Sequence, residues 1–291
     1  MVEKVGVIGL GIMGGIFARN LLAAGFEVIG FDIVPDNIDA IAAQGGGAAS
    51  SAADTVARSE ISIFSLPTVR AFETVVDEVA GAKPKGAIIL ETSTLPLDVK
   101  QAGRDALQTA GVTLLDCPIS GTSAHAADKK IVVLGSGDKA AYEKCLPVIA
   151  GFALDQRYIG PFGHGMIMKL LANTLVTIHV AATAEAMIMG MKAGLDPALV
   201  HEVLSASPAG SPMFTLRGAL MAKNDYLPAM MKIEVFQKDL DIISKFGKDL
   251  GAPAALFEAS VPPYRAAMAA HAQEDTAAIC AVLEEQAGIK R

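Results

Sequence analysis

Lys169, Asn173 and Thr177 recur at every fourth position of an otherwise apolar segment, residues 166–178. If the segment is helical, the three side chains share one face. Apolar surroundings lower the pKa of a lysine because burial disfavours the charged form, so Lys169 is a candidate proton donor and acceptor near neutral pH. The alternative is a lysine whose ammonium extends to solvent beside an ordinary polar asparagine. The spacing alone does not separate these two interpretations.

A glycine-rich turn near the N-terminus has the spacing G-x-G-x-x-G, at Gly9, Gly11 and Gly14. It follows a short apolar segment, residues 4–8, and leads into a helix-like stretch, the order that gives this motif its meaning. Gly9 permits a tight turn, Gly11 lets the backbone approach a pyrophosphate, and Gly14 lets the helix lie close to the strand. The helix N-terminus would face the phosphates. The sequence therefore predicts a dinucleotide site formed by Gly9, Leu10, Gly11, Ile12, Met13 and Gly14.

Asp32 follows a second apolar segment, residues 27–31. It lies about twenty residues after the glycines, where a carboxylate would accept a hydrogen bond from a ribose 2′-OH and repel a 2′-phosphate. No lysine or arginine follows Asp32 until Arg58, so the sequence offers no nearby partner for a 2′-phosphate. We therefore predict NAD rather than NADP as the cofactor.

Three polar segments follow apolar, strand-like runs: residues 65–67, residues 92–94 and residues 116–123. Ligands of open parallel sheets bind at the carboxyl ends of the strands. The first two segments could therefore meet a cofactor. The third, with its hydroxyls and flexible backbone, suits a substrate carboxylate. Each could equally be ordinary turn structure, and the residue types alone leave both interpretations open.

Alternating strand-like and helix-like runs occupy residues 1 to about 160, as expected for βαβ units on a parallel sheet. The Gly45-Gly46-Gly47 run and the small residues after it predict a turn and the start of a helix. Helices are expected between the strands, for example at residues 68–80 and 97–110. The strands are expected at residues 4–8, 27–31, 61–66, 86–90, 112–116, 131–135 and 156–159.

Helical periodicity alone continues beyond Gly160. Residues 166–193 predict one helix, about 40 Å long at 1.5 Å per residue. The predicted fold is an α/β Rossmann-type doubly wound domain, residues 1–162, followed by an all-α domain, residues 163–291, with a long interdomain helix between them. The first domain would bind NAD, and the second would serve substrate binding and oligomerisation. The later helices are expected at residues 197–205, 214–222, 233–250, 253–270 and 275–286.

The composition is that of an apolar globular protein, because 52% of the 291 residues are hydrophobic. Such an excess predicts broad apolar faces buried between subunits. A net charge of −7 argues against a nucleic-acid partner. No window of about twenty residues lacks charged or strongly polar groups, so no membrane span is expected. Cys117, Cys145 and Cys280 show no metal-type spacing, and we interpret them as reduced, mostly buried thiols of a cytoplasmic protein.

Four motifs in this chain resemble those of the β-hydroxyacid dehydrogenase family, which includes 3-hydroxyisobutyrate dehydrogenase and tartronate semialdehyde reductase. Residues 9–14 with Asn20-Leu21 match the cofactor signature, and residues 116–122 match the substrate segment Asp-x-Pro-x-Ser-Gly-Gly except at the last position. Residues 163–173 match the helix motif Gly-x-Gly-x-x-x-Lys-x-x-x-Asn, and residues 238–240 match a late Lys-Asp-Leu. The motifs stand in the family's order and span essentially the whole chain.

The resemblance implies an NAD-dependent oxidoreductase that transfers hydride between nicotinamide and a small 3-hydroxy carboxylate or its semialdehyde. It implies Lys169 as the catalytic acid/base and Asn173 as a partner that holds the substrate. Ser120 and Gly121 are implied at the substrate carboxylate, with Thr122 beside them. The residues implied around the cofactor are Leu66, Pro67, Thr94 and Lys238. The likeness and the apolar composition together suggest a homodimer or homotetramer.

Thr122 is a departure from the family, whose members usually repeat glycine after Ser-Gly. Ser123 and His125 add further polarity, which favours a hydroxylated acid over a branched apolar one. His125 could instead be a surface loop residue, and His164 is interpreted as a residue of the helix start rather than a ligand.

Two other functions remain open from the sequence. An imine reductase shares this architecture, but that subgroup typically lacks the catalytic lysine. A non-catalytic dinucleotide-binding regulatory protein is the second alternative, and Lys169 together with Asn173 argues against it as well.

Overall fold

The computed structural model describes residues 4–291, which divide into two compact units. The first unit ends at Lys169, and the second runs from Leu170 to Arg291. The division falls inside the long helix α8, His164–Lys192, rather than in a loop. One helix therefore contributes residues to both units.

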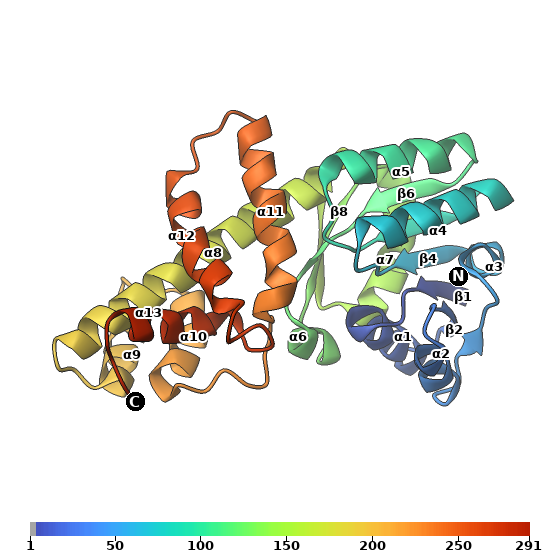
Figure 1. The fold of residues 1–291 in the computed structure, drawn as a ribbon. Coiled ribbons are helices and arrows are strands. Elements are labelled where there is room, and N and C mark those ends of the chain that lie inside the picture. The colour runs from blue at the N-terminus through green and yellow to red at the C-terminus, as the bar shows by residue number, and fades with distance from the viewer. Residues whose placement is uncertain (1–3) are drawn as a thin grey trace. The chain divides into compact units, whose positions relative to one another are not determined.

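Among the described residues, a single sheet of nine strands forms the centre of the first unit (Figure 1). Its order is β3-β2-β1-β4-β5-β6-β8-β7, with β9 beside β8. The chain winds outward in both directions from β1 and β4, which is the doubly wound order of dinucleotide-binding folds and confirms the predicted fold class. The strands are β1 Lys4–Ile8, β2 Glu27–Phe31, β3 Gly47–Ala48, β4 Ile61–Phe64, β5 Ile88–Glu91, β6 Thr113–Asp116, β7 Ile119–Ser120, β8 Val132–Ser136 and β9 Asp155–Gly160.

The central strands are buried on both faces, so successive side chains enter two different cores. On β5, Ile88 and Leu90 belong to one core, and Ile89 belongs to the other. Phe17 of α1 and Phe152 of α7 meet in the first core, with ring centroids 4.8 Å apart. Helices α4 and α5 cover the second core. The helices of this unit are α1 Ile12–Ala23, α2 Pro35–Ala42, α3 Ala52–Ala57, α4 Val69–Ala82, α5 Leu97–Thr109, α6 Ser123–Ala127 and α7 Lys139–Phe152.

The parallel sheet expected from the βαβ units has one exception, at β8. Strands β1 to β6 pair in parallel, but β8 runs antiparallel to β6 and to β7, and Asp116 pairs with Ser136. The strand β7 has only two residues, so no period in the sequence indicates it. After β7 the chain passes Gly121, where φ is +134° and an added Cβ would lie 2.7 Å from a methyl carbon of Ile131.

The second unit is helical throughout its described residues, and the C-terminal part of α8 lies within it. The hydroxyl of Tyr264 donates to the carbonyl of Thr177 at 2.9 Å, and the Tyr264 ring lies against Phe236. A buried ion pair, Arg217–Asp275, also lies in this unit, with 2.7 Å between the guanidinium nitrogen and the carboxylate oxygen. The helices are α9 Pro197–Ser205, α10 Pro212–Lys223, α11 Ile233–Asp249, α12 Ala255–Ala267 and α13 Ile279–Gln286, the last preceded by a 3₁₀ turn, Thr276–Ala278.

By length and composition alone, α8 could cross a membrane, and 39% of its most apolar window is buried within the protein. Its buried face, however, includes polar groups that bond to neighbouring helices. The Asn173 side chain donates a hydrogen bond to Asp239 of α11. The backbone carbonyl of Thr177 accepts a hydrogen bond from the hydroxyl of Tyr264, on α12. These are the contacts of a core helix in a folded domain.

Candidate functional site

The three glycines of the N-terminal motif meet three different surroundings. At Gly9, where φ is +85°, an added Cβ would lie 2.2 Å from the carbonyl oxygen of Ser65. At Gly14 it would lie 1.8 Å from the carbonyl oxygen of Gly9, so the start of α1 packs directly on the end of β1. At Gly11 it would meet no atom within 4 Å. Two glycines are therefore required by packing, and the third leaves open space at the start of a helix.

That open space fits the phosphates of a dinucleotide. Gly11 is the N-cap of α1 and, having no side chain, accepts no side-chain cap hydrogen bond from the amides of the first turn. Backbone N–H groups at a helix N-terminus form a site for anions, which a missing Cβ leaves accessible. Of the other motif residues, Leu10 is buried and Ile12 is exposed. Leu10 packs on Gly30 of β2, because a Cβ at Gly30 would lie 2.8 Å from a Leu10 methyl carbon.

The Asp32 carboxylate lies beside this turn. One oxygen accepts a hydrogen bond from the Leu10 amide at 2.6 Å, and the other accepts from the Val34 amide at 2.8 Å. The structure thus brings the predicted acid and the predicted phosphate-binding turn together at the carboxyl ends of β1 and β2. Each carboxylate oxygen retains a lone pair for a further donor.

The two predicted segments after β4 and β5 are also joined. The Leu66 amide donates to the hydroxyl of Ser93 at 2.8 Å, and the Thr92 hydroxyl donates to the carbonyl of Phe64 at 2.6 Å. Pro67 is exposed, and Thr94 is half-buried. The predicted strand 61–66 ends early, at Phe64, because Leu66 leaves the sheet to bond with Ser93. These residues lie at the same edge of the sheet as the glycine turn.

The predicted substrate segment begins at the end of β6. Ser120 is the last residue of β7 and is half-buried, and Gly121 follows it. Thr122 is the N-cap of α6, and its hydroxyl accepts a hydrogen bond from the amide of His125. The His125 ring nitrogen in turn lies 3.1 Å from the Thr122 hydroxyl and 3.3 Å from its amide. Thr122 and His125 therefore form a capping box, a local role that the sequence analysis missed.

The helix α8, which carries Lys169, is anchored at the amides of its first turn. The Met166 amide donates to a carboxylate oxygen of Asp116 at 2.7 Å, and the Gly165 amide donates to the Ser136 hydroxyl at 2.9 Å. Lys169 follows within the next helical turn and is half-buried. His164, as expected, is the first residue of this helix. Asp116 therefore links the start of the lysine helix to the start of the substrate segment.

Asn173 lies one turn after Lys169, within the second unit. Its amide nitrogen donates to a carboxylate oxygen of Asp239 at 2.9 Å, and both side chains are buried. The other oxygen of Asp239 lies 3.8 Å from the ammonium of Lys238, which is next to it on α11. The structure thus brings Asn173 and the Lys-Asp-Leu motif together. Asp239 was given no role from the sequence, although its place in that motif signals it.

Comparisons with known proteins agree with this arrangement. The model for the NAD-binding domain of 6-phosphogluconate dehydrogenase matches residues 4–160. The model for the NAD-binding domain of NADP-dependent 3-hydroxyisobutyrate dehydrogenase matches residues 163–283. L-threonate dehydrogenase from Cupriavidus necator is 31% identical over 284 residues, which are 96% of this chain and 95% of that protein.

Solved structures show the same fold. The 3-hydroxyisobutyrate dehydrogenase of Mycobacterium tuberculosis, in a structure with L-serine, superposes with a TM-score of 0.91 at 26% identity, over 97% of this chain and 99% of that one. An imine reductase of Streptomyces aurantiacus superposes with a TM-score of 0.61 at 18% identity, over 97% of this chain and 99% of that one, a likeness of fold alone.

Fold, glycine turn and family models together define an NAD(P)-binding oxidoreductase that acts on CH–OH groups of small hydroxy acids. More particularly, the chain belongs to the β-hydroxyacid dehydrogenase family, since it is 31% identical to an L-threonate dehydrogenase over 96% of its length and the two family models match residues 4–160 and 163–283. The resemblance inferred from the four sequence motifs is thereby confirmed.

Proposed function

We propose that this protein is an NAD-dependent dehydrogenase or reductase of a small 3-hydroxy carboxylate or its semialdehyde, with Lys169 as the general acid/base. One observation carries the proposal. Asp116 holds the first turn of the helix that bears Lys169 and directly precedes the segment that bears Ser120 and Gly121. A group able to transfer a proton and a segment able to bind a carboxylate are thus fixed to the same residue.

In the oxidative direction, the neutral amine of Lys169 takes the proton of the substrate hydroxyl, and in reduction its ammonium returns that proton. The nicotinamide, when bound, accepts or supplies the hydride. The Ser120 hydroxyl and the backbone amide of Gly121 donate to the substrate carboxylate, where charge-assisted hydrogen bonds are strong. Asn173, whose amide group is held by Asp239, binds the substrate beside Lys169.

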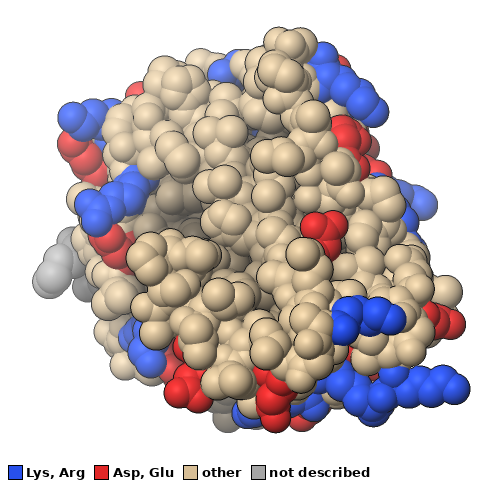
Figure 2. All heavy atoms as spheres, turned by 90° about the vertical axis from the view of Figure 1, so that its left-hand side faces the viewer, with Lys and Arg blue, Asp and Glu red and all other residues tan. Residues whose placement is uncertain are grey.

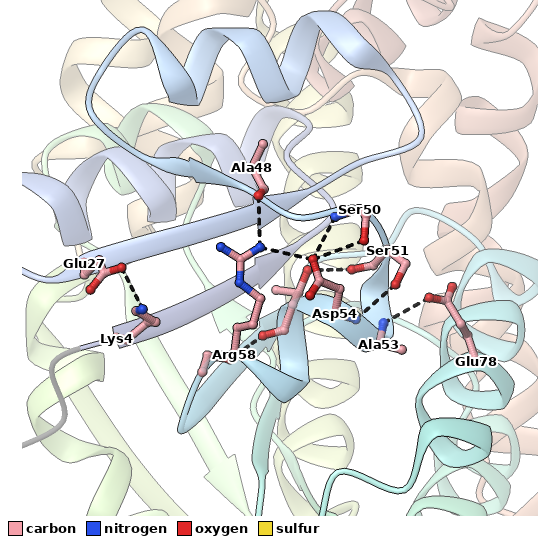
Figure 3. A network of polar contacts seen from close by, with 11 residues as sticks. Lys4, Glu27, Ala48, Ser50, Ser51, Ala53, Asp54, Arg58 and Glu78 are labelled. Atoms are coloured by element: carbon pink, nitrogen blue, oxygen red, sulfur yellow. Dashed lines mark hydrogen bonds and ion pairs between the residues drawn. The ribbon is translucent and has the colours of Figure 1, made fainter.

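The choice of NAD over NADP is supported by the charges around the end of β2. Asp32 places a carboxylate there, and the next cation along the chain, Arg58, is already engaged (Figure 3). Its guanidinium donates to the carbonyl of Ala48 at 3.2 Å and to the carboxylate of Asp54 at 3.1 Å. A 2′-phosphate at this edge would face the carboxylate of Asp32, and Arg58 is already bonded to other groups and would not offset that charge. A ribose hydroxyl would instead find an acceptor.

For the substrate, we propose an acid that carries a further hydroxyl. The segment after Gly121 is polar, and the Thr122 hydroxyl, which contacts the amide and the ring nitrogen of His125, retains capacity for one further hydrogen bond. The likeness to an L-threonate dehydrogenase, whose named substrate carries several hydroxyls, also supports a hydroxylated substrate.

We propose a homodimer or homotetramer, formed through the helical unit. Figure 2 shows a face of that unit on which uncharged side chains predominate and charged ones lie mainly towards the edges. Large apolar side chains are exposed on α8, on α9 and on the loop between them. They include Met189, Leu195, Leu199 and Val203. Replacing Leu199 and Val203 with aspartate should shift the mass measured by light scattering to that of a monomer.

We also propose a cytoplasmic location, which the three free, buried cysteines of the described chain support. The function itself is tested by the change in nicotinamide absorbance with a panel of small 3-hydroxy acids and their semialdehydes, each with NAD and with NADP. Turnover of at least one acid is expected. Silence with every acid, in a protein that still binds NADH, would instead favour the regulatory protein that binds a dinucleotide without catalysis.

A further inference from the structure

A lysine with no exposed side-chain surface lies in the first unit between two equally buried carboxylates. The ammonium of Lys100, on α5, is 2.6 Å from an oxygen of Asp116 at the end of β6. It is also 2.6 Å from an oxygen of Glu91 at the end of β5. Burial alone would lower the pKa of Lys100, but the two carboxylates more than offset burial and raise it, so the ammonium is charged at neutral pH. The triad therefore holds one buried cation against two carboxyl groups.

The Asp116 side of the triad reaches the helix that carries Lys169. While one oxygen of Asp116 contacts Lys100, the other accepts from the Met166 amide at 2.7 Å and from the Ser136 hydroxyl at 3.1 Å. The same hydroxyl accepts from the Gly165 amide. An added Cβ on Gly165 would lie 2.2 Å from the carbonyl oxygen of Leu134, so the helix start is pressed against β8. The first turn of α8 thus has two anchored amides.

The Glu91 side of the triad reaches the residues expected around the cofactor. One oxygen of Glu91 contacts Lys100, and the other accepts from the Ser93 amide at 2.9 Å. The Ser93 hydroxyl in turn accepts from the Leu66 amide at 2.8 Å. One ammonium is therefore joined through two carboxylates to two segments that serve different steps of the proposed reaction.

An ion triad is a poor means of stabilising a core. Removing three charged groups from water costs several kcal/mol each, and well-packed apolar replacements are often equally stable or more stable. We therefore look for a role of the triad that depends on the direction of its hydrogen bonds and that apolar side chains would not provide. The fixed geometry of the amides that each carboxylate holds supplies such a role.

We propose that Lys100, Glu91 and Asp116 are positioning residues, in which one buried ammonium fixes the lysine helix through Asp116 and the cofactor-side segment through Glu91. The proposal rests on the proposed function, because it assigns the two segments to proton transfer and to cofactor binding. None of the three side chains is required to touch substrate or cofactor.

A matched pair of variants, Asp116→Asn and Glu91→Gln, tests the proposal. Each keeps the shape of a fully buried side chain, removes one negative charge and turns an amide group toward the same lysine. Of the two carboxylates, Asp116 accepts from an amide of α8, and Glu91 accepts from the amide of Ser93. A merely stabilising role predicts similar losses in both variants. Separate positioning roles predict that the two variants differ in which amides exchange faster and in whether kcat or the KM for NAD changes.

The first measurement is hydrogen–deuterium exchange of the intact protein and does not depend on turnover. In Asp116→Asn, the amides of residues 164–168 should exchange about tenfold faster or more, as expected for a lost hydrogen bond to a charged acceptor. In Glu91→Gln, the accelerated exchange should lie at residues 92–94 and 66. Equal acceleration of both regions in both variants, or acceleration of neither, would overturn the proposal.

The second measurement separates kcat from KM. Asp116→Asn should lower kcat by about tenfold or more with little change in the KM for NAD, because it disturbs the helix that carries the base. Glu91→Gln should raise the KM for NAD with kcat within about threefold of the parent. A parent protein that turns over no substrate would contradict the proposed function and leave the exchange measurement to decide the positioning proposal.

Ser136→Ala is the milder variant if either isostere fails to fold. It removes only the oxygen that joins Asp116 to the Gly165 amide. Exchange at residues 164–168 should still accelerate. Val148→Ala, a buried truncation in α7 whose apolar side chain forms no hydrogen bond with the triad, is the control for general loss of stability. If Ser136→Ala exchanges no faster at α8 than Val148→Ala does, the proposal is wrong.

Discussion

The main-chain amide of Leu10 donates a hydrogen bond to the carboxylate of Asp32 at 2.6 Å, which ties the glycine turn to the end of β2. Because the Val34 amide holds the second oxygen, the carboxylate is fixed at two points. A change of charge at this position should therefore affect the choice of cofactor more than the fold.

The first prediction is that the protein prefers NAD to NADP and that Asp32→Ala narrows the preference. A 2′-phosphate facing the carboxylate should cost a few kcal/mol, hence roughly a hundredfold or more in affinity. The measurement is kcat/KM with each cofactor in parent and variant. Asp32→Asn keeps the shape without the charge and serves as the matched control. Equal or higher kcat/KM with NADP in the parent would refute the assignment.

The second prediction is that Lys169→Ala loses activity mainly in kcat. A general acid/base typically contributes ~10²–10⁴-fold, so the variant should retain its fold and its affinity for NADH while turnover falls by that order. Lys192→Ala is the control, since Lys192 lies on the same helix and only donates to the carbonyl of Ala287 at 3.0 Å. A Lys169→Ala enzyme within a few-fold of the parent would exclude the lysine as acid/base.

The third prediction concerns substrate class. Glycerate or threonate should be used better than 3-hydroxyisobutyrate, because a site that hydrogen-bonds a hydroxyl rejects analogues that lack it. Thr122→Gly should weaken this preference with little loss of stability, since glycine is tolerated at an N-cap at a cost of only a few tenths of a kcal/mol. A parent that favours 3-hydroxyisobutyrate by about tenfold or more, about 1.4 kcal/mol, would disprove the polar pocket but not the dehydrogenase.

The fourth prediction concerns stability at alkaline pH. Burial raises the pKa of the Cys145 thiol to about 12, against a smaller opposing effect of Lys144. Between pH of about 9 and 12 the folded thiol thus keeps a proton that the unfolded chain loses, so stability falls as pH rises. One such group contributes up to about 1.4 kcal/mol per pH unit.

Urea unfolding of the parent at several pH values above 8.5, the ordinary pKa of a thiol, measures this slope. Cys145→Ser should flatten it, whereas Val148→Ala, on the same helix, should lower stability by the same amount at every pH. An unchanged slope in Cys145→Ser would show that this thiol does not titrate differently in the two states.

Sequence patterns predict the elements that form distinct apolar runs. We find the strands before Gly9 and Asp32 and the long helix after Gly163 where the sequence predicts them. Buried parallel strands are short apolar runs, and the helix is one long apolar segment that ends before Gly194. The two-residue strand β7 is too short to form such a run, so the sequence analysis missed the antiparallel turn at Gly121. The capping box of Thr122 was missed because histidine, rather than glutamate or glutamine, supplies its second half.

The triad around Lys100 was beyond the reach of sequence patterns for a different reason. Lys100 lies in a polar segment, residues 97–109, where lysine is ordinarily a solvent-exposed residue of a surface helix. Its partners are nine and sixteen residues away, at the ends of two strands. Only the register of the sheet, which pairs Glu91 with Asp116, places the two carboxylates side by side.

Because Gly11 and Gly14 have different surroundings, mutations at these two positions of one short motif should have different consequences in the cell. A methyl group at Gly14 would collide with the backbone of Gly9, so that replacement removes the folded protein from the cell. A methyl group at Gly11 meets no atom within 4 Å, so the altered chain is expected to fold and accumulate with an impaired affinity for nucleotide. In the oligomer that we propose, such chains would occupy subunit positions without binding the cofactor, whereas chains with the Gly14 lesion would be absent from it.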